Sequence, residues 1–122
     1  MIKLLEIGIE YAVAFSVSGK ITEDNMDFIL NVAREKSKQN EHIVILERIE
    51  SFDGVSLTAL IEEFKYLREV GFSNIKRVAV VTDSKWIKPI VTIEDKIFRS
   101  MDIKCFPLEQ EAEAIKFLWG ED

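Results

Sequence analysis

The residues of this chain that could carry nucleophilic or acid–base chemistry are few and scattered. His42 is the only histidine and Cys105 the only cysteine. A Ser–His–Asp or Cys–His arrangement would depend on His42, and no spacing in the sequence supports one. Cys105 has neither a histidine nor a helix N-terminus beside it to activate its thiol, so we expect a small core residue in a strand. A single cysteine forms no internal disulfide, which is typical of a reducing cytoplasm.

Four carboxylates follow two of the predicted strands. Glu47, Glu50 and Asp53 cluster beyond the third strand, and Asp83 comes after the fourth. Open α/β sheets bind ligands at such carboxyl ends, but the same residues serve equally well as helix caps and solvated loop groups. The sequence has no zinc-ligand spacing, no phosphate-binding glycine loop and no dinucleotide fingerprint. It therefore predicts a binding module and not an enzyme, with no catalytic residue, no metal and no cofactor.

Length and composition predict one domain over residues 1–122. The chain is 48% hydrophobic and 31% charged, as in a globular protein with a sizeable core. Its net charge of −6 disfavours nucleic acid as a partner. That charge is uneven, because residues 76–104 carry +3 and the remainder −9. With no transmembrane-length apolar run and no signal peptide, we expect a cytoplasmic protein that is either free or peripheral to the inner face of the membrane.

The predicted helix at residues 86–101 is apolar around too much of its circumference. One strip, within about 80° at helical spacing, consists of Trp86, Ile90, Ile93, Ile97 and Met101. A second strip, on a flank about 100° away, consists of Ile87, Val91 and Phe98. Basic residues surround both strips: Lys85, Lys88, Lys96 and Arg99. The second strip needs a partner of its own, and basic residues beside an apolar face attract a helix to anionic lipid.

This pattern leads to a hypothesis about binding. The chain would hold an apolar or lipid-like molecule between its sheet and helix 86–101, which would swing outward to contact a membrane. Phe28 and Val32, off the inner stripe of the first predicted helix, would form the opposing wall of the pocket. Packing against a neighbouring helix or in a homodimer would bury the second strip equally well. The sequence leaves these alternatives open.

Hydrophobic periods and turn signals predict the remaining elements. Strands are expected at residues 2–9, 11–17, 42–47, 77–81 and 103–106. Helices are expected from Thr22 to about Lys38, from the N-cap Ser56 to Gly71, after Thr82-Asp83-Ser84, and at residues 109–119. The first helix should face inward with Met26, Ile29, Leu30 and Ala33, and the last with Ala112, Ile115, Leu118 and Trp119. The order β-β-α-β-α-β-α-β-α predicts an α/β sandwich with a mixed sheet whose later strands are parallel.

Three stretches carry a family resemblance. They are residues 14–22 (Ala-Phe-Ser-Val-Ser-Gly-Lys-Ile-Thr), 52–56 (Phe-Asp-Gly-Val-Ser) and 77–86 (Arg-Val-Ala-Val-Val-Thr-Asp-Ser-Lys-Trp). Their sequence and order resemble the SpoIIAA-like branch of the STAS-like superfamily, whose architecture is shared with CRAL-TRIO lipid-binding domains. The resemblance implies the STAS-like sandwich. It also implies a second function, that of a regulatory module similar to anti-sigma-factor antagonists, with a regulatory protein as partner.

The antagonists of this superfamily carry a phosphorylatable serine where the third strand passes into the second helix. The matching turn here is Asp53-Gly54-Val55-Ser56, which lacks the family's adjacent Asp-Ser pair. A phosphate on Ser56 would lie at a helix N-terminus, where free N–H groups favour an anion. A simple helix cap is the favoured interpretation of Ser56, and a regulatory phosphosite is the alternative.

Overall fold

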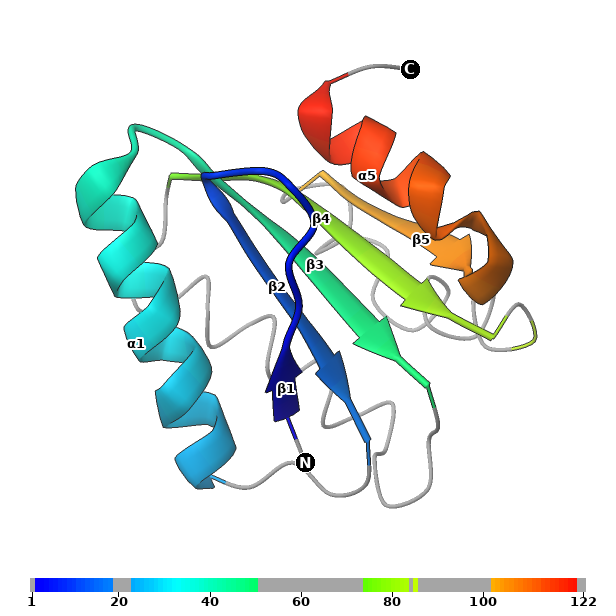
Figure 1. Ribbon diagram of the computed structural model, residues 1–122, viewed down its shortest axis with the longest axis horizontal. Helices are drawn as coiled ribbons and strands as arrows, with labels where there is room; N and C mark the ends of the chain where they lie inside the picture. Colours follow the sequence, from blue (N-terminus) through cyan, green and yellow to red (C-terminus); the bar gives the residue numbers. More distant parts are fainter. Residues whose placement is uncertain (1, 19–22, 51–73, 84, 86–101, 121–122) are drawn as a thin grey trace.

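Strands rich in β-branched residues alternate with helices along the chain. The computed structural model describes residues 2–18, 23–50, 74–83, 85 and 102–120, and every structural statement below concerns these residues. Their elements are β1 (Ile2–Leu4), β2 (Ala12–Val17), α1 (Glu23–Gln39), β3 (Ile43–Ile49), β4 (Ile75–Thr82), β5 (Ile103–Pro107), a 3₁₀ turn (Leu108–Gln110) and α5 (Glu111–Trp119). Figure 1 shows their arrangement. The helices predicted from Ser56 to Gly71 and over residues 86–101 lie outside the described residues.

The strands of the described residues form one sheet in the order β1-β2-β3-β4-β5. β1 is antiparallel to β2, and every later neighbouring pair is parallel. A parallel pair needs a crossover connection, which α1 supplies between β2 and β3. The predicted mixed sheet with parallel later strands is therefore confirmed.

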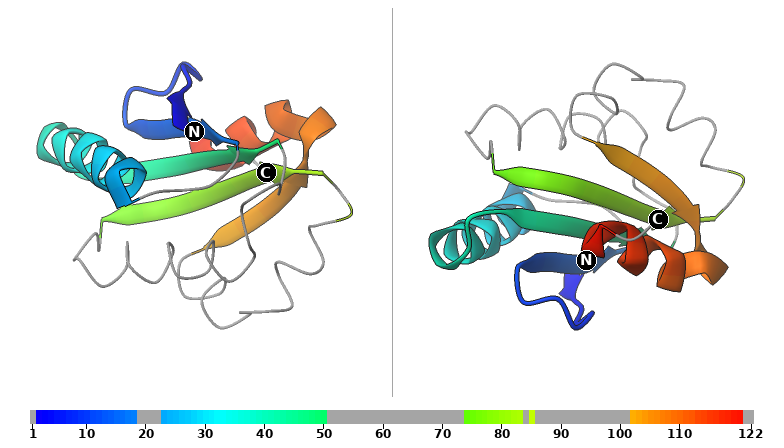
Figure 2. Two further views of the ribbon diagram at one scale, coloured as in Figure 1. Left: turned by 90° about the horizontal axis from the view of Figure 1, so that it is seen from below. Right: turned by 90° about the horizontal axis from the view of Figure 1, so that it is seen from above.

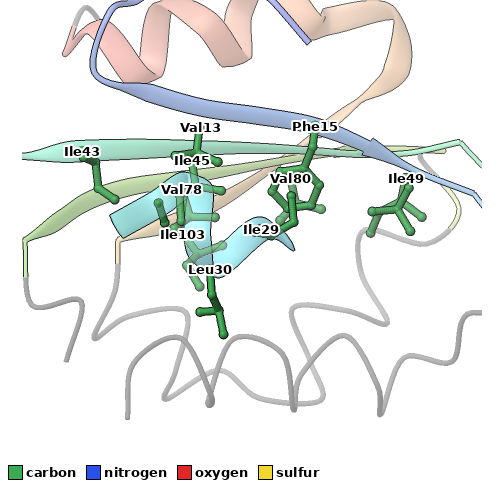
Figure 3. Close-up of a cluster of buried hydrophobic side chains, with 12 residues drawn as sticks. Val13, Phe15, Ile29, Leu30, Ile43, Ile45, Ile49, Val78, Val80 and Ile103 are labelled. Carbon is green, nitrogen blue, oxygen red and sulfur yellow. The ribbon is translucent and has the colours of Figure 1, made fainter. Parts of the chain in front are cut away.

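One face of the sheet packs against α1. Its buried side chains come from alternate positions of each strand, such as Val13, Phe15 and Val17 on β2, because successive residues of a strand point to opposite faces. Figure 3 shows the labelled strand residues pointing to the side where Ile29 and Leu30 of α1 lie. With Ala33, these two residues form the buried stripe of the helix, as the helical period predicts.

Two segments of the chain cover the other face of the sheet (Figure 2). α5 packs over β3, β4 and β5, and the segment between β1 and β2 packs beside it through Ile9, Ile7 and Leu5. The predicted strand at residues 2–9 is thus too long. It ends at Leu4, and the chain then folds over the small side chains of Ala12 and Ala14. Gly8, at a φ of 79°, has the left-handed backbone that this path requires. β2 is consequently buried on both faces.

The inward face of α5 differs from the prediction. Ala114 and Leu118 are buried, one helical turn apart, whereas Ala112 and Trp119 are exposed and Ile115 is half-buried. Their placement follows from the aromatic flank of the helix, because the Phe117 ring packs on Phe106 with centroids 5.8 Å apart. Trp119 lies about 200° around the helix from Phe117 and is exposed.

Two arginines of the sheet hold the ends of α5. Arg48 of β3 donates from Nε to Glu111 Oε1 over 2.6 Å at the first residue of the helix. Arg77 of β4 donates from Nη1 to the Phe117 carbonyl oxygen over 3.0 Å near its last turn. A cation at a helix C-terminus also interacts favourably with the helix dipole. Gly120 ends the helix in the left-handed conformation, with its N–H directed at the Lys116 and Phe117 carbonyls.

Candidate functional site

The parallel strands β2, β3 and β4 end in register at one edge of the sheet. Ile49 lies in register between Val17 and Thr82. We call this end of the sheet the carboxyl edge; it consists of Val17, Ile49 and Thr82 with the residues that follow them, Ser18, Glu50 and Asp83. Thr82 is fully buried and donates from Oγ1 to the Ile49 carbonyl oxygen over 3.1 Å. This bond joins the last residues of β3 and β4, so the two connections that follow them leave from adjacent points.

Asp83 comes directly after the last residue of β4. Its Oδ1 accepts the backbone N–H of Lys85 over 3.1 Å, the usual role of an aspartate at a helix start. Lys85 is exposed and already helical. The sequence placed a capping group at Thr82-Asp83-Ser84, and the Asp83 bond confirms that part of the prediction.

Charged residues surround the end of β3. Arg48 is paired with Glu111 and lies 3.7 Å from the Glu50 carboxylate, measured from Nη1 to Oε1. The Arg48 and Glu111 side chains are partly shielded from water, at 26% and 29% exposure, whereas Glu50 is 56% exposed. At the carboxyl edge Glu50 is exposed and Asp83 is half-buried, while the guanidinium of Arg48 is engaged by the carboxylates of Glu50 and Glu111.

Glu47 is not the loop carboxylate that the sequence suggested. β3 continues to Ile49, so Glu47 lies inside the strand and is fully buried. It shares the α1 face with Ile45 and Ile49 and lies in register between Phe15 and Val80. The strand signal was present in the alternation of apolar residues at positions 43, 45 and 49, which continues past the charged Glu47-Arg48 pair. A buried carboxylate is costly unless it is paired, hydrogen-bonded or protonated.

Cys105 and His42 are far apart in the sheet. Cys105 is half-buried against the α1-side core, and burial raises the pKa of its thiol to about 12. The thiol is therefore protonated at neutral pH and a poor nucleophile. His42 is exposed just before β3, whereas Cys105 is in register with Val80, itself opposite Glu47. Five residues of strand separate the two positions by about 17 Å along the sheet, which excludes a Cys–His dyad.

We call helix 86–101, which would cover the hypothesised lipid pocket, the lid, and the residues of this hypothesis are only partly described. Val32 of α1 packs against the core and is half-buried, Phe28 is 45% exposed, and Lys85 is exposed. The other residues named for the lid lie outside the described residues: Trp86, Ile87, Ile90, Val91, Ile93, Ile97, Phe98, Met101, Lys88, Lys96 and Arg99. Ser56 also lies outside them. The structure thus places Phe28 and Val32 off the buried stripe of α1, and their role as a pocket wall stays a prediction.

A comparison with protein families agrees with this fold. The family model of SpoIIAA-like domains matches residues 12–119. The chain belongs to the SpoIIAA-like family. In this SpoIIAA-like chain the match runs from the first residue of β2 to the last residue of α5, so β1 lies outside it. No curated protein and no solved structure gives a significant match.

Two further features bear on function in this SpoIIAA-like domain. Within the described ranges, no three His, Cys, Asp or Glu side chains are grouped so as to hold a metal ion. In the same part of the chain, no helix has the length and apolar character needed to cross a bilayer.

Proposed function

We propose that this protein is a regulatory protein-interaction module that binds a partner protein over the carboxyl edge. The observation that carries the proposal is the SpoIIAA-like match over residues 12–119, because SpoIIAA-like domains are known in anti-sigma-factor antagonists, whose activity is to bind regulatory proteins. The carboxyl ends of parallel strands are also where open α/β sheets most often bind ligands.

In this proposal Ser56 acts as the switch. It follows Glu50 by six residues in the sequence, in the connection that leaves β3 at the carboxyl edge. Phosphorylation would add about −1.5 to −2 charges to the connection that leaves this edge, where Glu50 and Asp83 already carry negative charge. Such a group must lose its hydration when a partner docks, so phosphorylation weakens binding.

The experiment uses the tagged chain and its Ser56→Ala and Ser56→Asp variants, purified from the cells that make it. Co-purified proteins are identified by mass spectrometry, and the partner is then titrated calorimetrically against each variant. The wild type and Ser56→Ala should bind alike, and Ser56→Asp about tenfold more weakly. Gln39→Glu, an exposed change at the opposite end of the sheet, adds one negative charge as the matched control. Equal dissociation constants for Ser56→Asp and Gln39→Glu would refute the switch.

The hypothesis of a lipid-like ligand under helix 86–101 is a separate proposal. It rests on the two apolar strips and the basic residues of the sequence, and the family assignment favours the regulatory function over it. Co-sedimentation with anionic vesicles distinguishes the two. Binding that Phe98→Asp with Lys88→Glu abolishes would support the lid, and vesicle binding unaffected by these changes would exclude it.

A further inference from the structure

A groove of about 250 Å³ lies at the end of the sheet opposite the carboxyl edge. It is formed where β3 and β4 begin and where α1 and α5 end, and Figure 1 shows both helices ending on this side. We call it the amino-edge groove; its lining residues are Tyr11, Asn40, Glu41, His42, Lys76, Arg77, Leu118 and Trp119. The proposed function does not use this groove, so a ligand bound in it would be independent of a partner at the carboxyl edge.

One wall of the amino-edge groove is aromatic and held in place. Trp119 is 50% exposed although it is the largest apolar side chain of α5. The Tyr11 ring meets it edge-to-face at a right angle, with centroids 6.0 Å apart. The helix end that carries the indole is itself fixed by the Arg77 bond to Phe117 and by Gly120. A large, rigid and partly exposed aromatic side chain is the kind that contributes most to binding sites.

The lining of the groove also includes cationic and hydrogen-bonding side chains, which differ in whether they are already paired within the protein. Arg77 is engaged, because it bonds the Phe117 carbonyl and its Nε lies 3.5 Å from Asp102 Oδ2. Lys76 is exposed and has no ion pair with any residue that the structure describes, and the same holds for His42. An ammonium group and an imidazole beside an indole favour a ligand that combines a ring with an anionic group.

The volume of the groove and the charges that line it further limit the class of ligand that fits. Sites for drug-sized ligands usually measure about 300–1,000 Å³, so a groove of about 250 Å³ suits a molecule with a single ring. Glu41 adds a negative charge to the lining and disfavours a dianion relative to a monoanion. We propose that the amino-edge groove binds a small aromatic carboxylate, with its ring against the Trp119 indole and its carboxylate at the Lys76 ammonium.

The test is an NMR titration of the ¹⁵N-labelled full chain with benzoate. Shifts should concentrate on the amides of Tyr11, His42 and Lys76 and on the Trp119 indole N–H, with a dissociation constant on the order of 1 mM. Cyclohexanecarboxylate, which keeps the charge without the aromatic ring, and benzamide, which keeps the ring without the charge, should each bind about fivefold more weakly. Phenyl phosphate, a dianion, should also bind more weakly than benzoate.

Variants test the two contacts separately. Lys76→Gln changes an exposed side chain and should weaken benzoate binding about fivefold, whereas Lys38→Gln, an exposed lysine of α1 outside the groove, should leave it unchanged. Trp119→Ala should weaken binding about tenfold, with the ¹⁵N spectrum reporting that the fold is retained. The proposal is overturned by the absence of groove shifts at about 20 mM benzoate. It is equally overturned if Lys76→Gln matches Lys38→Gln, if cyclohexanecarboxylate binds as well as benzoate, or if phenyl phosphate binds more tightly.

Discussion

The hydroxyl of Thr82 donates a hydrogen bond to the carbonyl oxygen of Ile49 over 3.1 Å, joining the ends of two neighbouring parallel strands. Thr82 is fully buried, so water cannot replace this bond. The connection after β3 leads toward Ser56, and Asp83 directly after β4 accepts the N–H of Lys85. The bond thus fixes the spacing of the two strand ends from which these connections leave.

Thr82→Val should destabilise the protein by about 1–3 kcal/mol, because valine fills the same space and leaves a buried carbonyl without its donor. Urea unfolding of the two proteins measures the difference. Thr82→Ser keeps the hydroxyl and loses only a methyl group, so its amide exchange around Ile49 should resemble that of the wild type. A valine variant as stable as the wild type would show that the bond contributes nothing.

The ion pair between Arg48 and Glu111 should contribute about 1 kcal/mol to the stability of docked α5, since both side chains are partly shielded from water. A double-mutant cycle with Arg48→Met and Glu111→Gln measures this coupling. Raising the salt concentration should reduce it only slightly at such partial burial. The exposed pair of Lys38 and Glu35 is the matched control and should show a smaller coupling that salt removes. Equal couplings for the two pairs would contradict this account.

Gly120→Ala should destabilise the protein more than Gly8→Ala. Both glycines have positive φ, at 90° and 79°, so each alanine costs about 1–2 kcal/mol in backbone strain. A Cβ on Gly120 would also lie 2.8 Å from Arg77 Nη1, whereas a Cβ on Gly8 would have no atom within 4 Å. The additional loss of stability in Gly120→Ala over Gly8→Ala therefore measures the clash of the new Cβ with Arg77, which caps α5. This additional loss should vanish when Arg77 is replaced by methionine. An excess that persists in Arg77→Met would locate the strain elsewhere.

The stability of the protein should fall as the pH rises from about 9 to about 12, in part through Cys105. Its folded-state pKa is raised to about 12 from an ordinary value of 9.0. Above pH 9 the unfolded chain loses the thiol proton while the folded chain keeps it, so folding becomes less favourable by up to about 1.4 kcal/mol per pH unit. Below pH 9 both states are protonated and Cys105 contributes no slope. Unfolding of wild type and Cys105→Ala across this range isolates the effect, and parallel pH profiles would contradict it.

Much of the fold follows from local sequence signals. The run from Ile43 to Leu46 predicts a strand buried on both faces, and the structure confirms it. Three residues of the predicted stripe, Ile29, Leu30 and Ala33, are buried in α1, and the side chain of the fourth, Met26, lies outside what the structure describes. These predictions succeed because the residues that repeat with the two-residue period of a strand or the 3.6-residue period of a helix are the same residues that the fold buries.

The sequence-based predictions fail where tertiary contacts determine the local structure. The charges of Glu47 and Arg48 make the strand β3 look as if it ended two residues too early in the sequence. In the structure Glu47 is buried in the sheet, and Arg48 is paired with Glu111, 63 positions away in the sequence. The face of α5 depends on the packing of the Phe117 ring against Phe106, which no period within the helix encodes. Trp119 lies on another side of the helix from Phe117, is 50% exposed and lines the amino-edge groove, which no local period of the sequence predicts.

Hydrogen–deuterium exchange of the chain with and without its purified partner tests the central claim most directly. A regulatory partner bound at the carboxyl edge should slow exchange in peptides that contain Glu50 and Asp83 and should leave those at His42 and Lys76 unchanged. Ser56→Asp should remove this protection at the same partner concentration. Protection confined to the amino end of the sheet, or protection at the carboxyl edge that survives Ser56→Asp, would contradict the proposal that a Ser56-switched partner docks there.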